Sequence, residues 1–467
     1  FPTEADQARE RRRLFDLIER LVVWENTTDE RLLAEAHAEI VKSCDGHPPA
    51  ILDPFAGGGS VPLEAQRLGL EAHASDLNPV AVLINKALIE LPPKWAGRPP
   101  VFPGAAESRL GDDWPKATGL AEDVRRYGAW MREEAERRIG HLYPRARLDD
   151  GTTAPVIAWI WARTVTCPNP ACRATVPLVR QTWLKKKKGD NVALEMKPHT
   201  TENRMAFYVR RARSENDFGF DPAGFSQRGN SVCGRCGTTV TSDHVKAEGK
   251  AGRMGAQLMY IASVRSGSTG KVYLSPDDLF IPVPNAQIIE KRLEELRRET
   301  GLAAPTSRIS DDKRAFTTPL YGLETFGSLF TKRQTLFLLT MIKYLRKARQ
   351  QMTDEGVDDD FSKGIIVELA MWIDRLADQN SSLCTLYPLG GRGVVHTFVR
   401  QALPMIWDYA EANPLGSASS NVDSSLDYTV EALKTCAKAE GLPAIVQRSS
   451  ATSMPFPEHL FEVIVTD

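Results

Sequence analysis

The chain has 467 residues, of which 42% are hydrophobic and 25% charged, and these values exclude a largely disordered protein. Its formal net charge of -1 means that affinity for a polyanion has to come from local patches. Because no run of 18 apolar residues occurs, we expect a soluble, cytoplasmic protein. The seven cysteines should then be reduced, and cysteines that occur in clusters indicate metal ligands rather than disulfides.

The first part of the chain predicts helices and then an α/β repeat. Residues 8–42 have the pattern of two amphipathic helices. A short buried strand follows at 50–52, then a glycine turn, a helix over 60–69 and a second strand that ends on Asp76. Asp53 and Asp76 are 23 positions apart, about one βαβ repeat, so we expect both at the carboxyl edge of adjacent parallel strands. Open α/β sheets bind ligands at that edge.

The glycine turn DPFAGGGS, residues 53–60, indicates the kind of ligand. It differs from the dinucleotide fingerprint G-x-G-x-x-G because a carboxylate precedes the glycines, and that acid would repel a pyrophosphate. S-adenosylmethionine fits better, since it has an ammonium group for the acid, a carboxylate for the helix N-terminus and ribose hydroxyls for Asp76. The alternative is a nucleotide-fold turn that binds no cofactor.

On these residues the sequence resembles the class I amino-methyltransferases, whose first motif runs D-P-F-x-G-x-G and whose second motif ends on an acid that holds the ribose. The resemblance implies an α/β fold with a Rossmann-like methyltransferase sheet that binds S-adenosylmethionine. The cofactor-binding candidates in this part are Asp53, Pro54, Phe55, Gly57, Gly59, Asp76 and Asn78. For Asn78 the alternative is that it only caps the next helix.

The end of the chain continues the resemblance. Two strand-like runs bracket a loop in residues 444–467, and the last run ends on Asp467, where the family has D-P-P-Y or N-P-P-Y. The resemblance implies that Asp467 is the catalytic acid; the alternative is the strand-end aspartate of any α/β protein. Ser450 and Ala451 stand where the family often has an acid followed by alanine, so the adenine contact of this loop departs from the family pattern. We expect the chain to be a fragment that is inactive alone.

A large, mainly helical insertion is predicted between residues 95 and about 440, because the third strand of the sheet does not occur there. It contains CPNPAC at 167–172 and CGRCG at 233–237, which predict a tetrahedral Zn²⁺ site in a zinc ribbon. The ligands would be Cys167, Cys172, Cys233 and Cys236. The 60 residues between the pairs exceed the usual ribbon length, so an extra hairpin is expected. The alternative is four unrelated surface cysteines.

Positive charge is concentrated between the cysteine pairs. Residues 173–213 hold eleven Lys or Arg against three acids, a local excess of +8, and Trp183, Phe207 and Tyr208 are interleaved with them. This pattern favours contact with phosphates and unstacked bases. The nucleic-acid candidates are Lys185, Lys186, Lys187, Lys188, Arg210 and Arg211. The run KKKKGD is equally typical of a solvated hairpin tip, and SGSTGK at 266–271 lacks the residues of a phosphate loop and predicts a hairpin turn.

Further amphipathic helices are predicted over 286–299 and 331–352. Phe330, Arg333 and Gln334 at the start of the second one have a counterpart in FVRQ at 398–401. This pair of motifs resembles bacterial phage-defence-associated adenine methylases with a zinc-ribbon insertion, a resemblance that extends along most of the chain. Packing of helices in a core is the alternative for these stretches.

The expected organisation and function follow from these motifs. The predicted parts are the N-terminal helices with the cofactor motifs (1–95), a helical insertion (96–165), a zinc ribbon with hairpins (166–275), a second helical insertion (276–440) and the rest of the methyltransferase sheet (441–467). The resemblance implies methyl transfer to the N6 amino group of adenine in double-stranded DNA, with the adenine flipped out, in restriction–modification or phage defence beside other defence proteins. The alternatives are cytosine, RNA or protein amide targets, or a zinc-ribbon nucleic-acid-binding module on an inactive fold.

Overall fold

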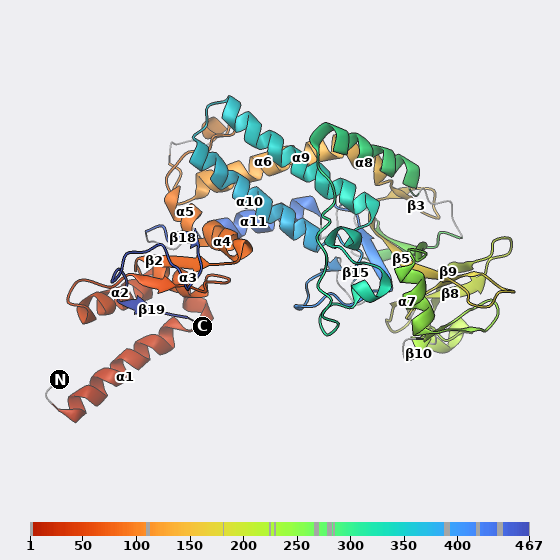
Figure 1. Ribbon diagram of the computed structural model, residues 1–467, viewed down its shortest axis with the longest axis horizontal. Coiled ribbons are helices and arrows are strands. Elements are labelled where there is room, and N and C mark those ends of the chain that lie inside the picture. Colours follow the sequence, from red (N-terminus) through yellow and green to blue (C-terminus); the bar gives the residue numbers. More distant parts are fainter. Residues whose placement is uncertain are drawn as a thin grey trace. The chain divides into compact units, whose positions relative to one another are not determined.

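The computed structural model shows a mixed α/β protein that divides into two compact units (Figure 1). Unit 1 comprises residues 1–128, 348–371 and 426–467, and unit 2 comprises 129–347 and 372–425. The structure describes residues 3–108, 113–180, 182–223, 226–227, 230–265, 270–277, 283, 285–386, 393–416, 421–436 and 442–466. None of the described helices is long and apolar enough to cross a membrane.

Unit 1 begins with the two helices that the sequence predicts, α1 (Glu4–Leu21) and α2 (Glu30–Ser43). Each starts at a side-chain cap, since Thr3 Oγ1 accepts the backbone N–H of Asp6 and Asp29 Oδ1 accepts that of Leu32. Their apolar faces meet in a small cluster of Leu17, Leu32 and Ala36.

The sheet of unit 1 is entirely parallel and has the order β18-β2-β1-β19. Its strands are β18 (Ile445–Arg448), β2 (Ala72–Asp76), β1 (Ile51–Asp53) and β19 (Val463–Ile464). Helices α3 (Ser60–Arg67) and α4 (Pro79–Asn85) follow β1 and β2, and the buried apolar cluster includes Ala74, Ile89 and Val446. Asp53 and Asp76 are the last residues of neighbouring parallel strands, as the sequence predicts.

Unit 2 is built on two antiparallel sheets. The larger has the order β14-β13-β5-β17, with β6 also paired to β5, and the smaller has the order β7-β8-β9. Their strands are β14 (Lys271–Leu274), β13 (Gly255–Val264), β5 (Val156–Thr166), β17 (Asp408–Ala412), β6 (Thr175–Pro177), β7 (Trp183–Lys185), β8 (Asn191–Pro198) and β9 (Met205–Ala212). Side chains of both sheets, such as Ile160, Leu194 and Phe207, share one core cluster.

Helices hold more residues than strands between residues 95 and 440, but the insertion also contains these sheets, which were predicted only in part. The run VIAWIWARTVT forms the central strand β5, which is almost entirely buried, although it lies partly in the range 96–165 that was predicted to be helical. Its β-branched and aromatic residues favour a strand, but a run that is buried on both faces lacks the alternation that identifies one. SGSTGK (266–271) lies between the antiparallel partners β13 and β14, which agrees with a hairpin, although residues 266–269 lie outside the described residues.

The other elements are helical or short. The helices are α5 (Leu91–Lys94), α6 (Thr118–Ile139), α7 (Ser242–Lys250), α8 (Ala286–Thr300), α9 (Lys332–Asp354), α10 (Asp359–Asp378) and α11 (Val422–Cys436), with a π-turn at Lys86–Glu90. The short strands are β3 (Ala146–Arg147), β4 (Thr153–Ala154), β10 (Ser226–Gln227), β11 (Asn230–Val232), β12 (Thr239–Val240), β15 (Thr385–Leu386) and β16 (Val394–Val395). Helices α8 and α9 match the predictions for 286–299 and 331–352.

The start of α9 places a charged pair in the core of unit 2. The Arg333 Nη2 atom lies 2.7 Å from Glu411 Oε2, and the two side chains are only 3% and 5% exposed. Leu336 and Leu339 on the same helix are also buried, as core packing predicts. The two RQ motifs therefore differ in environment, because Phe398 and Val399 of FVRQ are 55% and 62% exposed.

Candidate metal centre and strand-edge site

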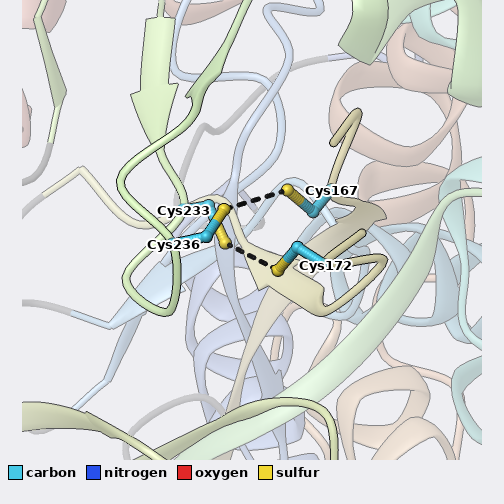
Figure 2. Close-up of side chains that lie close together, drawn as sticks. All are labelled: Cys167, Cys172, Cys233 and Cys236. Atoms are coloured by element: carbon cyan, nitrogen blue, oxygen red, sulfur yellow. Dashed lines mark hydrogen bonds between the residues drawn. The ribbon is translucent and has the colours of Figure 1, made fainter. Parts of the chain in front are cut away.

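Four cysteine side chains converge in unit 2 (Figure 2). The Sγ atoms of Cys167, Cys172, Cys233 and Cys236 all lie within 4.8 Å of one another. The Cys167–Cys236 and Cys172–Cys233 sulfur pairs are 3.7 Å and 3.9 Å apart. Four sulfurs placed tetrahedrally at about 2.3 Å from a zinc ion would be about 3.8 Å apart. The four thiols can therefore hold a metal ion such as zinc.

Two backbone turns build this cluster. After β5, the Cys167 N–H donates to the Ala174 carbonyl at 2.8 Å, and the Cys172 N–H donates to the Asn169 carbonyl at 3.0 Å. After β11, the Gly237 N–H donates to the Cys233 carbonyl at 2.8 Å, with Gly237 at φ +76°, a left-handed conformation that glycine adopts readily. Each C-x₄-C or C-x₂-C segment thus closes on itself and directs both sulfurs to one side.

The four thiols differ in environment. Cys167 and Cys233 are buried, Cys172 is half-buried and Cys236 is exposed. Burial raises the pKa of Cys167 to about 12, whereas hydrogen bonds with Thr238 lower the pKa of Cys236 to about 6. Without a cation, the buried thiol would stay protonated at neutral pH. A divalent ion at the centre would favour the deprotonated form of all four thiols, because thiolates are the form of cysteine that binds metal.

The two strand-end aspartates organise the glycine loop of unit 1. Asp53 is 2% exposed, and its Oδ1 accepts the Phe55 N–H at 3.0 Å. The two oxygens of Asp76 accept the N–H groups of Gly57 at 2.9 Å and Asn78 at 2.8 Å. The carboxylates therefore hold the loop after β1 close to the end of β2.

Asn78 behaves as the capping alternative predicts. Its side-chain oxygen accepts the N–H of Val80 at 3.0 Å and caps helix α4. Pro54, which was a cofactor candidate, is buried beside Asp53, whereas Phe55 is 60% exposed. Of these three candidates, Phe55 alone combines a large apolar side chain with an exposed position at the strand edge.

Asn85 is a residue of this site that the sequence analysis missed. Its Nδ2 donates to the carbonyl of Gly57 at 3.0 Å, and its buried Oδ1 has no hydrogen-bond partner in the described structure. Gly59 has φ +82°, and a Cβ on it would lie 2.3 Å from that Oδ1 atom. Any other residue at position 59 would be strained in this backbone conformation and would displace the Asn85 side chain. A polar residue in the apolar run AVLIN was the signal in the sequence.

The loop after β18 reaches the same edge. Arg448 of β18 pairs in register with Asp76 of β2, and the Ser449 N–H donates to the Asp76 carbonyl at 3.2 Å. Ser450 and Ala451 follow directly, and the Ser450 hydroxyl lies 2.9 Å from the hydroxyl of Thr452 in a local turn. The structure thus brings Ser450 and Ala451 to the carboxyl edge that bears Asp53 and Asp76.

Two further apolar side chains, not anticipated from the sequence, are exposed near this edge. Leu77 is 65% exposed and follows Asp76 directly, and Val80, in the first turn of α4, is 60% exposed. Asp467 lies outside the described residues. The strand that precedes it pairs with β1, and the Val465 N–H donates to the Leu52 carbonyl at 2.9 Å.

The lysine run forms the turn between β7 and β8, which agrees with the hairpin-tip alternative. Lys185 is ion-paired with Asp190, and Lys186 lies 3.1 Å from Glu215 and 4.1 Å from the centre of the Trp183 ring. Two of the four charges are therefore compensated locally, while Lys187 and Lys188 are exposed.

The aromatic residues of the basic segment are only partly accessible. Phe207 is fully buried in the core of unit 2, so the prediction that it contacts bases is wrong. Tyr208 is half-buried, and the guanidinium of Arg210 lies 5.1 Å from its ring centre. Arg210 and Arg211 lie on β9, at the edge of the three-stranded sheet.

Comparison with known proteins identifies no relative of this chain. No family model, curated protein or solved structure matches this chain. Function therefore has to be inferred from the metal centre, the strand-edge site and the basic strands themselves.

Proposed function

We propose that this protein transfers a methyl group from S-adenosylmethionine to the N6 amino group of adenine in DNA, in restriction–modification or phage defence. The observation that carries the proposal is the parallel order β18-β2-β1-β19. Numbered by their order along the chain, these strands read 3-2-1-4, which is part of the order of a Rossmann sheet. The order reverses between β1 and β19, and such sheets bind ligands in the crevice at that point.

The residues at this edge fit the proposed cofactor. Each oxygen of Asp76 accepts one backbone N–H, and a carboxylate oxygen has a second acceptor position that a ribose hydroxyl can use. Asp53 supplies negative charge for an ammonium group. The Gly59 turn leads into the N-terminus of α3, where N–H groups favour a carboxylate.

The exposed apolar side chains support the same ligand. Phe55, Leu77 and Val80 are each at least 60% exposed near the two aspartates. Covering apolar surface contributes about 25 cal/mol per Å², so a flat adenine ring would be stabilised there. A site that combines carboxylates with exposed apolar groups suits a nucleoside better than a small polar ion.

The chemistry would use Asp467, which the family resemblance makes the catalytic acid. Bound S-adenosylmethionine would supply a methyl group on a positively charged sulfur. The adenine amino nitrogen is a poor nucleophile because its lone pair is delocalised into the ring. The Asp467 carboxylate would accept a hydrogen bond from the amino group and so orient its lone pair toward the methyl group. Such positioning can contribute about 7–11 kcal/mol. The base has to leave the duplex, at a cost of a few kcal/mol, and contacts of unit 2 with the backbone would offset that cost.

Cofactor binding tests this proposal directly. Asp76→Ala should weaken S-adenosylmethionine binding by about 10- to 150-fold, because loss of a hydrogen bond to a charged group costs about 1.5–3 kcal/mol. Isothermal titration calorimetry measures the affinity. Glu71→Gln is the matched control, because Glu71 immediately precedes the same strand at its opposite end, its side chain is 54% exposed, and the amide keeps an oxygen for the contact with His73 Nε2. Absence of binding to the unaltered chain, or equal affinities of the two variants, would contradict the proposal.

A further inference from the structure

A basic groove lies between the edges of the two sheets of unit 2. Its volume is about 730 Å³, and the described charged residues that line it are Arg210, Arg211, Arg265, Lys271 and Asp149. Arg210 and Arg211 come from β9, and Lys271 comes from β14. Each of these strands lies at the end of its sheet, so residues distant in sequence line one hollow. We name it the β9–β14 groove.

The charges in this groove are unbalanced. Among the described residues that line it, four are cations and one is a carboxylate, an excess of three positive charges in a chain whose formal net charge is -1. Two acids outside the lining contact it, because Glu195 pairs with Arg210 and Asp150 pairs with Arg265. Like charges gathered in one hollow repel one another, and an anion bound there relieves this repulsion.

The existing ion pairs leave donors for a ligand. The Arg210 and Arg265 side chains are 42% and 46% exposed, and exposed pairs contribute about 0–1 kcal/mol. Among the described contacts, Arg210 donates only its Nε–H to Glu195, at 2.9 Å, although a guanidinium has five N–H groups. Arg211 is exposed on the same strand. A phosphate could therefore bind without breaking the fold.

Lys271 supplies the fourth positive charge of the groove. It is half-buried, and burial lowers the pKa of its ammonium group. An anion close to it would offset this effect and favour the charged form. The groove thus combines exposed guanidinium donors with a partly desolvated ammonium group.

We propose that the β9–β14 groove binds the phosphodiester backbone of DNA. This inference rests on the proposed function and identifies the surface of unit 2 that holds the substrate. A polymeric polyanion is favoured over a small anion because the cations come from separate segments of the chain, and because the rest of the segment 173–213, counted without Arg210 and Arg211, still has nine Lys or Arg against three acids. Backbone contacts of this kind position DNA without reading its sequence.

The test compares two double variants that lose the same charge. The logarithm of the DNA affinity falls linearly with the logarithm of the salt concentration. If each side chain makes one phosphate contact, Arg211→Gln with Lys271→Gln should make this slope shallower by about 1.8 for duplex DNA and by about 1.4 for a single strand. Fluorescence anisotropy of labelled oligonucleotides of both kinds, measured across salt concentrations, gives the slopes. Arg308→Gln with Arg314→Gln is the control, because these side chains are 77% and 91% exposed and lie outside the groove.

Three results would overturn the groove proposal. The first is an unchanged slope in the groove variant, and the second is an equal loss in the control. The third is displacement of the oligonucleotide by a free mononucleotide at the same concentration of phosphate groups, which would identify a small-anion site. Calorimetry with S-adenosylmethionine separates this proposal from the function, since the groove variant should keep wild-type cofactor affinity. If the unaltered chain binds DNA through the groove but does not bind the cofactor, the proposed function fails and the groove proposal stands.

Discussion

Replacing Cys167 and Cys233 with serine should remove one bound zinc ion per chain and unfold the region around the cysteine turns. These are the two buried ligands, and they lie in a cluster with Val165, Val176 and Val240. Structural zinc contributes apparent binding free energies of about 10–16 kcal/mol in small zinc domains at neutral pH. The loss should therefore exceed that of an ordinary core substitution, and chelation of the metal should have the same effect.

Metal analysis of the purified protein, together with thermal unfolding, measures this effect. Cys44→Ser is the matched control, because Cys44 is a half-buried cysteine of unit 1 that belongs to no metal cluster among the described residues. It should keep one zinc per chain. A stoichiometry near zero in the unaltered protein, or an unchanged one in the double variant, would rule out the metal centre.

Glu411→Gln should destabilise unit 2 by about 3–5 kcal/mol, because it leaves the Arg333 charge buried without its partner. Arg333 donates to both carboxylate oxygens of Glu411, at 3.1 and 2.7 Å. The indole N–H of Trp161 and the hydroxyl of Thr331 donate to the same carboxylate at 2.9 and 2.7 Å. Burial raises the pKa of Glu411, but Arg333 and these donors lower the pKa by a larger amount, so it lies below its ordinary value.

Urea unfolding followed by circular dichroism gives the change in stability. Glu324→Gln serves as the comparison, because it breaks the surface pair with Arg308 and should cost no more than about 1 kcal/mol. The double variant Arg333→Met with Glu411→Leu should recover much of the lost stability, since replacing both charges removes the unpaired one. If Glu411→Gln costs no more than Glu324→Gln, the ion pair does not stabilise the core.

The cysteine cluster and the strand-end acids could be predicted because local sequence determines them. A C-x₂-C turn ending in Gly237 fixes its two sulfurs wherever the turn lies, and an apolar run ending on Asp76 marks a strand end. The strand β5 was missed for the opposite reason. Burial on both faces removes the alternation that distinguishes a strand from a buried helix, and its partners β13 and β17 are far away in the chain.

Pairing between distant residues explains the other differences between the sequence predictions and the structure. Arg333 and Glu411 are 78 residues apart, so neither motif alone indicates an ion pair. Arg265 and Lys271 join Arg210 only because two sheet edges meet. The lysine run gave the strongest local signal for nucleic acid, yet Lys185 and Lys186 pair with acids nearby. Local charge counts identify a basic segment but do not identify which of its cations remain available.

Methyl transfer to DNA is the measurement that tests the proposed function most directly. The assay uses the natural full-length protein. Purified protein is incubated with S-adenosylmethionine carrying a labelled methyl group and with unmethylated DNA, which is then digested to nucleosides and separated. We expect the label in N6-methyladenine, and none with Asp467→Ala, which should still bind both ligands. Label in cytosine, no label in any base, or full activity of Asp467→Ala would contradict adenine methylation by this site.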